Sequence, residues 1–277
     1  MKESSQTNRL ILAILAMVVG LFMVIVAPIL TQISMERVIT SLVQVGQERP
    51  QYSSGVPLFL VFYPLWRTFI FVGGITLILL AFPICKGREW TYPAGLLASA
   101  FPAAGGMFMF LPYVSWVEGF PIPMVICWVG LAFFWALIFL RHADKWEKWG
   151  HLFALTFMGM LATHAFVVGV GSLRTLMTRP GAPLFEGLEW QALTIVGPVN
   201  WLCVVLLIIS IPLLANKKLL GWWLPLISAV SILAINIPTQ FIRTKTLDYL
   251  YGSLIAIGLL FFLLFPKFKK AHLGENP

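Results

Sequence analysis

Residues 58–85 read LFLVFYPLWRTFIFVGGITLILLAFPIC, a run of 28 residues whose only charged member is Arg67. A bilayer core of roughly 30 Å needs about 20 apolar residues in a helix, since each residue advances the helix by about 1.5 Å. The run is therefore long enough to cross a membrane. Transmembrane strands would need alternating segments of about ten residues, and this run is continuously apolar. We therefore expect a helix.

Seven further segments, of 19 to 25 residues, are also apolar and long enough to cross a membrane. The sequence thus predicts an all-α integral membrane protein. Its eight transmembrane helices are expected at residues 10–30, 58–85, 92–112, 122–140, 149–171, 190–214, 221–241 and 248–266.

The composition excludes most other classes of protein. Of the 277 residues, 59% are hydrophobic and 11% are charged, whereas a soluble domain carries roughly a quarter charged residues. The net charge of +8 comes from basic residues spread over short connectors, a pattern typical of membrane topology, so we expect no nucleic-acid partner. The three cysteines, Cys85, Cys127 and Cys203, lie in different segments without Cys-x-x-Cys spacing, which predicts neither disulfides nor a thiolate metal site.

The distribution of Lys and Arg orients the helices, because positive residues resist translocation. If the N-terminus is cytoplasmic, twelve basic residues lie on the cytoplasmic side and seven on the outer side. This split predicts a bacterial-type inner (plasma) membrane protein with both termini in the cytoplasm.

The outer connector at residues 31–57 carries its own pattern. Met35, Val38, Ile39, Leu42 and Val43 fall on one helical face, and polar residues fall elsewhere. This spacing predicts an amphipathic helix lying along the outer membrane interface.

The two halves of the chain resemble each other. Gly130-Leu131-Ala132-Phe133-Phe134 and Gly258-Leu259-Leu260-Phe261-Phe262 lie 128 residues apart, and other Pro-ended segments match at similar offsets. We therefore predict two four-helix membrane units, residues 1–140 and 141–277. Because four is an even number, the two copies would share one orientation and form a parallel repeat.

Asp and Glu are absent from the interior of the eight predicted spans, which disfavours a proton or sodium pump. The chain also lacks a phosphate loop, a His-Glu-x-x-His run and a Gly-x-Ser-x-Gly elbow, so no catalytic residue is assigned. His151 and His164 lie about 20 Å apart along one helix and cannot share a haem. We expect neither haem nor another metal site, and we interpret His142 and His151 as flanking a solvated cytoplasmic hinge.

Polar residues gather on the outer half of the predicted spans. Burying them in hydrocarbon costs several kcal/mol unless they are paired, so they should face one another or a cleft. The candidate ligand-binding residues are Arg67, His164, Asn200, Asn236 and Gln240, and Glu118 and Glu189 are candidate ion-pair partners for Arg67. The competing interpretation is that these residues only tie helices together or mark the interface.

Three functions fit this pattern. The preferred one is a non-catalytic membrane protein or complex subunit that binds a lipid or quinone in an outer cleft. The second is a transporter or flippase-like carrier of a small or amphipathic solute. The third is the membrane subunit of a quinone-linked oxidoreductase whose redox centres lie on partner chains. The expected partners are membrane lipids and other membrane subunits.

Overall fold

The computed structural model describes residues 5–142, 144–178 and 187–274. Within these ranges every regular element is a helix. In chain order they are α1 (Gln6–Leu21), η1 (Phe22–Val26), α2 (Ala27–Glu48), η2 (Pro50–Tyr52), α3 (Gly55–Cys85), α4 (Thr91–Trp116), α5 (Pro123–Arg141), α6 (Lys145–Leu173), η3 (Arg174–Thr178), α7 (Gly187–Ala215), α8 (Leu219–Ile242), α9 (Asp248–Leu264) and α10 (Pro266–Leu273).

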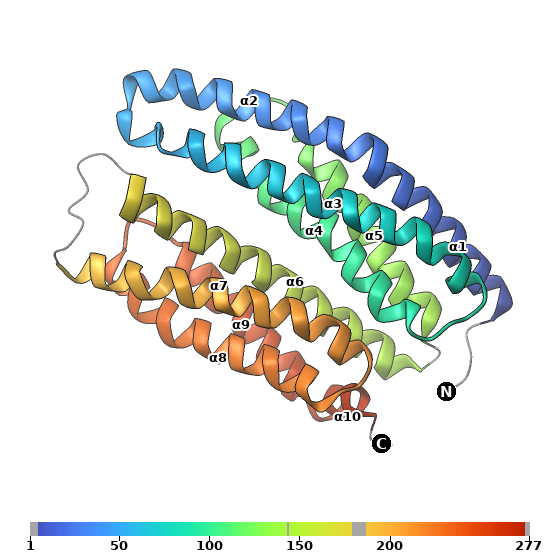
Figure 1. Ribbon diagram of the computed structural model, residues 1–277. Helices are drawn as coiled ribbons and strands as arrows, with labels where there is room; N and C mark the ends of the chain where they lie inside the picture. Colours follow the sequence, from blue (N-terminus) through green and yellow to red (C-terminus); the bar gives the residue numbers. More distant parts are fainter. Residues whose placement is uncertain (1–4, 143, 179–186, 275–277) are drawn as a thin grey trace.

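The helices run side by side as a long bundle (Figure 1). In the described part of the chain, seven helices are long and apolar enough to cross a membrane, and α9 with α10 adds an eighth if the bent pair is counted as one span. The bend of 71° falls at Phe265, which is extended because it precedes Pro266. The all-α, multi-pass architecture is thus confirmed.

The first helix is longer than predicted. α1, η1 and α2 form one continuous helix of 43 residues, Gln6–Glu48, which is about 65 Å long at 1.5 Å per residue. Pro28 has no backbone N–H and would interrupt a regular helix. Here the chain widens into one π-helical turn, in which the Ala27 N–H donates to the carbonyl of Phe22, and the helix continues past the proline.

This continuity changes the interpretation of the outer connector 31–57. Its first part is helical as predicted, but α2 extends α1 instead of starting a separate helix laid along the membrane. The buried face of α2, with Thr31, Ser34, Val38 and Leu42, packs against α3 and α4. The amphipathic pattern therefore reflects contact with neighbouring helices of the same chain.

We call α1–α5 the first half and α6–α10 the second half. In the first half, consecutive membrane helices contact each other and α1 also contacts α5; in the second half, consecutive helices contact each other and α6 also contacts α9. The halves meet where α4 packs against α6 and α7 and where α5 packs against α6. In Figure 1 the blue-to-green half lies beside the yellow-to-red half.

The chain ends lie at one end of the bundle (Figure 1). This "termini end" contains the start of α1, the α3–α4 and α7–α8 connectors, the α5–α6 junction and α10. The opposite, "distal" end contains η2, η3, the α4–α5 connector and the α8–α9 connector (residues 243–247). The connectors at the two ends of the bundle are therefore separated by the length of the apolar helices.

Five aromatic side chains join the halves, and we call them the aromatic junction: Phe62, Trp66, Phe108, Phe166 and Trp201. The ring centroid of Phe166 lies 5.3 Å from those of Phe62 and Phe108, 5.4 Å from that of Trp66 and 6.2 Å from that of Trp201. Such ring pairs contribute about 0.5–1.5 kcal/mol beyond the area they bury.

Glycines bring α4 and α5 close together. A Cβ on Gly130 would lie 2.6 Å from the backbone nitrogen of Ala103, and one on Gly106 would lie 2.5 Å from that of Cys127. Small residues at helix contacts in lipid allow such close packing. The α4–α5 pair therefore depends on positions that accept no side chain.

We expect Gly130→Ala to lower the thermal stability of the purified protein, because overpacking costs about 1–3 kcal/mol. Gly159→Ala is the matched control, since a Cβ there meets no atom within 4 Å. It should be neutral or stabilising by up to about 1 kcal/mol, the usual gain of alanine over glycine in a helix. Equal melting temperatures for the two variants would contradict the close contact.

Candidate functional site

A cavity of about 860 Å³ opens at the distal end, between the two halves. Its lining comes from η2, α3, α4, α6, η3, the start of α7, the α8–α9 connector and the start of α9. Binding pockets for small ligands commonly measure about 300–1,000 Å³. The cavity is therefore large enough to hold a small molecule or part of a lipid.

The deeper wall of the cavity is apolar. It is formed by side chains of α3, α4 and α6, namely Leu58, Phe59, Phe108, Leu111, Pro112, Val167, Val168 and Val170. Phe108 also belongs to the aromatic junction, so the cavity ends at the packing that joins the halves. This wall offers hydrocarbon contact without hydrogen-bonding groups.

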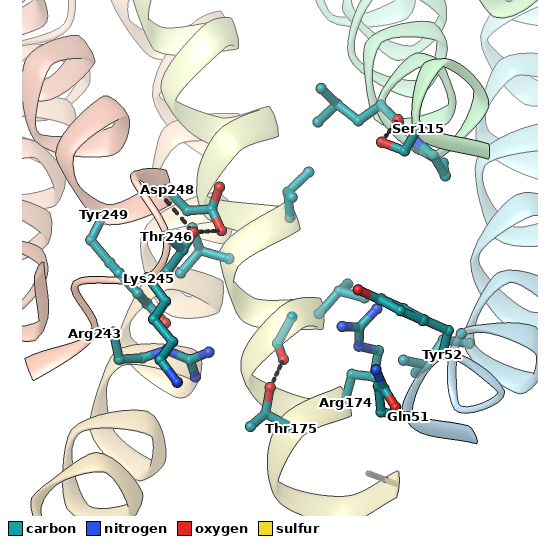
Figure 2. Close-up of a pocket in the computed structure, with 18 of the residues that line it drawn as sticks. Gln51, Tyr52, Ser115, Arg174, Thr175, Arg243, Lys245, Thr246, Asp248 and Tyr249 are labelled. Atoms are coloured by element: carbon teal, nitrogen blue, oxygen red, sulfur yellow. Dashed lines mark hydrogen bonds between the residues drawn. The ribbon is translucent and has the colours of Figure 1, made fainter. Parts of the chain in front are cut away.

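The rim on the side of the second half is charged. Arg243, with 18% of its side chain exposed, forms an ion pair with Glu189 at 3.4 Å. The hydroxyl of Thr246 donates to Asp248 at 2.5 Å, and Lys245 is exposed. Figure 2 shows Arg243, Lys245, Thr246 and Asp248 together on this side of the cavity.

The other side of the rim is formed around the end of α6. Figure 2 shows Arg174 beside Gln51 and Tyr52, across the α6 ribbon from Arg243 and Lys245. The ring of Tyr52 packs edge-on against Trp116 with centroids 4.9 Å apart, which holds η2 against α4. The cavity lining thus contains three cationic residues and two carboxylates, and its formal charge is positive.

None of the five predicted ligand-binding residues lines this cavity. Three of them nevertheless come together inside the second half. The Asn200 side-chain amide donates to Asn236 Oδ1 at 3.2 Å, and both residues are fully buried. Asn236 Nδ2 and His164 Nδ1 lie 2.6 and 2.9 Å from the point that a Cβ on Gly252 would occupy. These three side chains therefore share one polar contact region on α6, α7 and α8.

Arg67 and Gln240 lie elsewhere. Arg67 donates to Gln32 Oε1 on α2 at 3.0 Å, and Gln32 donates in turn to Glu36 at 2.7 Å. Gln240 donates to the Thr246 carbonyl and accepts from the Leu250 N–H, at 2.7 and 2.9 Å. Arg67 is thus tied to the extended first helix, and Gln240 holds the α8–α9 connector in place.

The two candidate ion-pair partners of Arg67 differ. Glu118 is exposed in the α4–α5 connector, while Glu189 pairs with Arg243 and lines the cavity. Arg174, Arg243 and Lys245, the cations of the cavity, are among the seven basic residues that the sequence predicts on the outer side. These three cations lie in two connectors that are expected on the same side of the membrane. This clustering in the sequence could have indicated the site.

The charged run between His142 and His151 is exposed at Asp144 and Lys145, as expected for a solvated hinge, but the two histidines that flank it are covered. His151 is fully buried, and only 11% of the His142 side chain is exposed. The reason is that α10 turns back across this end, so that His272 stacks on His151 with ring centroids 5.4 Å apart. The charged residues next to His142 and His151 in the sequence give no sign that the distant segment α10 packs over them.

The comparisons with known proteins give no match: no protein-family model, curated protein or solved structure resembles this chain.

The Asn200–Asn236 bond should act as a structural tie between α7 and α8. A double-mutant cycle with Asn200→Ala and Asn236→Ala is expected to give a coupling energy of about 0.6 kcal/mol, and at most about 1.7 kcal/mol, as for other hydrogen bonds between membrane helices. Unfolding in mixed micelles measures it. Additive effects of the two substitutions would show that the amides do not stabilise each other.

Proposed function

We propose that this chain is a non-catalytic membrane protein that binds an amphiphile in the distal cavity. The ligand would be a lipid or a quinone-like molecule that carries an anionic group. The observation that carries this proposal is the pairing of an apolar wall with a cationic rim in one cavity between the halves. An amphiphile would use both features, because its polar head would meet the charged rim and its tail would cover the apolar wall.

The rim favours a ligand with an anionic head. Arg243 is paired with Glu189, whereas Lys245 is exposed and reaches the cavity beside Arg243 in Figure 2. A phosphate or carboxylate would contact Lys245 at the rim. Its tail would pack against Phe59, Phe108 and Val167, which line the inner wall.

The proposed orientation places this cavity on the outer side of an inner (plasma) membrane, with both termini cytoplasmic. The support is the uneven distribution of basic residues between the ends of the bundle. Among described residues, the distal half holds Arg37, Arg49, Arg67, Arg174, Arg243 and Lys245, and the termini end holds Arg9, Lys86, Arg88, Arg141, Lys145, Lys148, Lys217, Lys218, Lys267, Lys269 and Lys270.

We further propose that the halves are a parallel repeat. The support is the shared order of helix contacts, in which each helix packs against the next and the first against the fourth, together with the matched Gly-Leu-x-Phe-Phe segments. A cavity at the boundary of two repeats is also where carriers bind their solutes, so a carrier remains the second candidate function, distinguished by ligand flux in liposomes.

We expect purified protein in nanodiscs to bind anionic phosphatidylglycerol more tightly than zwitterionic phosphatidylcholine of the same chain length, as measured by native mass spectrometry. Lys245→Gln should reduce this preference about tenfold, the size of one charge-assisted contact of about 1.4 kcal/mol. Val167→Phe places a larger side chain on the apolar wall of the cavity and should weaken the binding of both lipids.

Lys218→Gln is the control, because Lys218 is an exposed lysine at the termini end. If Lys218→Gln and Lys245→Gln change the lipid preference equally, or if Val167→Phe changes nothing, the distal cavity is not the binding site.

The orientation can be tested with the native cysteines. Cys85 is exposed at the termini end, and Cys127 and Cys203 are buried. In intact cells, a membrane-impermeant maleimide should leave the wild-type protein unlabelled and should label Glu118→Cys in a Cys85→Ser background. Labelling of Cys85 from outside would reverse the proposed topology.

A further inference from the structure

A second polar cluster lies at the termini end, away from the distal cavity. It consists of Tyr92 in the first turn of α4, His142 directly after α5, and His151 in α6. Tyr92 is 5% exposed and His151 is fully buried. The cluster joins the two halves, because α4 belongs to the first half and α6 to the second.

Local structure brings these residues together. His142 is extended, with φ −87° and ψ 137°, so the chain leaves α5 and turns at once. Asp144 then begins α6 by accepting hydrogen bonds from the backbone N–H groups of Trp146 and Glu147. The short connector therefore folds α6 back against α4 and α5, and it places His142 and His151 on the same side as Tyr92.

Three heteroatoms of the cluster form a small triangle. Tyr92 Oη lies 2.8 Å from His142 Nε2 and 3.2 Å from His151 Nδ1. The two imidazole nitrogens are 3.1 Å apart. Ligand atoms bound at about 2.1 Å to one metal ion lie about 3.0 Å apart in octahedral geometry and about 3.4 Å apart in tetrahedral geometry. All three edges are close to this range.

Hydrogen bonds account for two of the three edges of this triangle and leave the edge between the two imidazole nitrogens without a proton of its own. A phenol has one proton and a neutral imidazole has one. The other ring nitrogen of His142, Nδ1, faces Glu147 Oε2 at 3.1 Å, and a carboxylate accepts that proton. Two protons, from Tyr92 and His151, are then left for three close contacts. A cation facing the three lone pairs would satisfy them together.

The surroundings of His142 match those of a metal ligand. Metal-binding histidines usually donate their second N–H to a carboxylate, which fixes the ring and its tautomer. Glu147 supplies this carboxylate to His142, and its other oxygen pairs with Lys217. The ring of His272 stacks parallel to that of His151, at an interplanar angle of 2°, so it covers the cluster but does not converge on the triangle.

We propose that Tyr92 Oη, His142 Nε2 and His151 Nδ1 bind a divalent first-row transition-metal ion such as Zn²⁺. In the described part of the chain, His, Cys, Asp and Glu alone form no group of three suited to a metal; the phenol oxygen is the third ligand here. Imidazole nitrogen favours Zn, Cu, Fe and Ni over Mg and Ca. The bound ion would connect α4, the α5–α6 connector and α6, and so link the two halves at this end.

The test uses the purified full chain, stripped with a chelator and titrated with Co²⁺ and then with Zn²⁺. We expect one Co²⁺ per chain with visible d–d absorption, displacement of Co²⁺ by Zn²⁺, and a Zn²⁺-dependent rise in melting temperature, since a ligand that binds only the folded state stabilises it. Tyr92→Phe keeps the packed ring but removes the oxygen. It should weaken Co²⁺ binding at least tenfold and shift the absorption bands.

His164→Gln is the matched control, because it removes a histidine from the same helix outside the cluster, and it should bind Co²⁺ like the wild type. The absence of stoichiometric Co²⁺ binding by folded wild-type protein would overturn the proposal and leave a proton-sharing network. Unchanged binding and spectrum in Tyr92→Phe would also overturn it. If His142→Gln or His151→Gln lowers the yield, metal content of the folded Tyr92→Phe variant decides the question.

Discussion

The packing of Phe166 against aromatic rings from both halves determines how the halves meet. Apolar side chains gain little by leaving lipid for a helix interface, so association in the membrane depends on close van der Waals contact and on polar ties. Phe166 on α6 contacts Phe62, Trp66 and Phe108 of the first half and Trp201 of the second. This contact sets the depth of the distal cavity, because Phe108 lies at its inner wall.

The boundary between the halves carries polar chemistry at both of its ends and rings in between. At the distal end, the connectors place Arg174, Arg243 and Lys245 around an opening. At the termini end, Tyr92 and two histidines meet in a buried cluster. Both arrangements bridge the two halves, so a shift of one half relative to the other would change the spacing at both ends.

Much of the architecture follows from the sequence because of one requirement: in hydrocarbon the backbone must satisfy its own hydrogen bonds, and a single continuous apolar segment does so only as a helix. The segment at 58–85 and its counterparts are long enough to reveal this directly. The end of the first helix could not be predicted in the same way. Pro28 and the polar residues after it suggest an end, but one wide turn carries the helix onward.

Depth along a helix was sufficient to group Asn200 with Asn236, since both had to pair with another polar side chain. It was not sufficient for Arg67, because depth does not say toward which neighbour a side chain points. Arg67 donates to Gln32, which belongs to the predicted outer connector 31–57. The contact between Tyr92 and His142 could not be predicted from the sequence, for a related reason. The two are 50 residues apart, and only the helix packing brings them together.

The π-helical turn at Phe22–Val26 also sets a phase between the two parts of the first helix. Such a turn holds one residue more than a regular one within about the same rotation, whereas each residue of a regular helix advances it by about 100°. If all the residues of this turn were wound regularly, α2 would rotate by about that angle relative to α1. Thr31 and Ser34 would then leave their buried face, and Gln32 would turn away from Arg67. The wide turn therefore absorbs one residue and keeps the phase of α2, so a single-residue deletion is expected to be tolerated better inside this turn than elsewhere in the first helix.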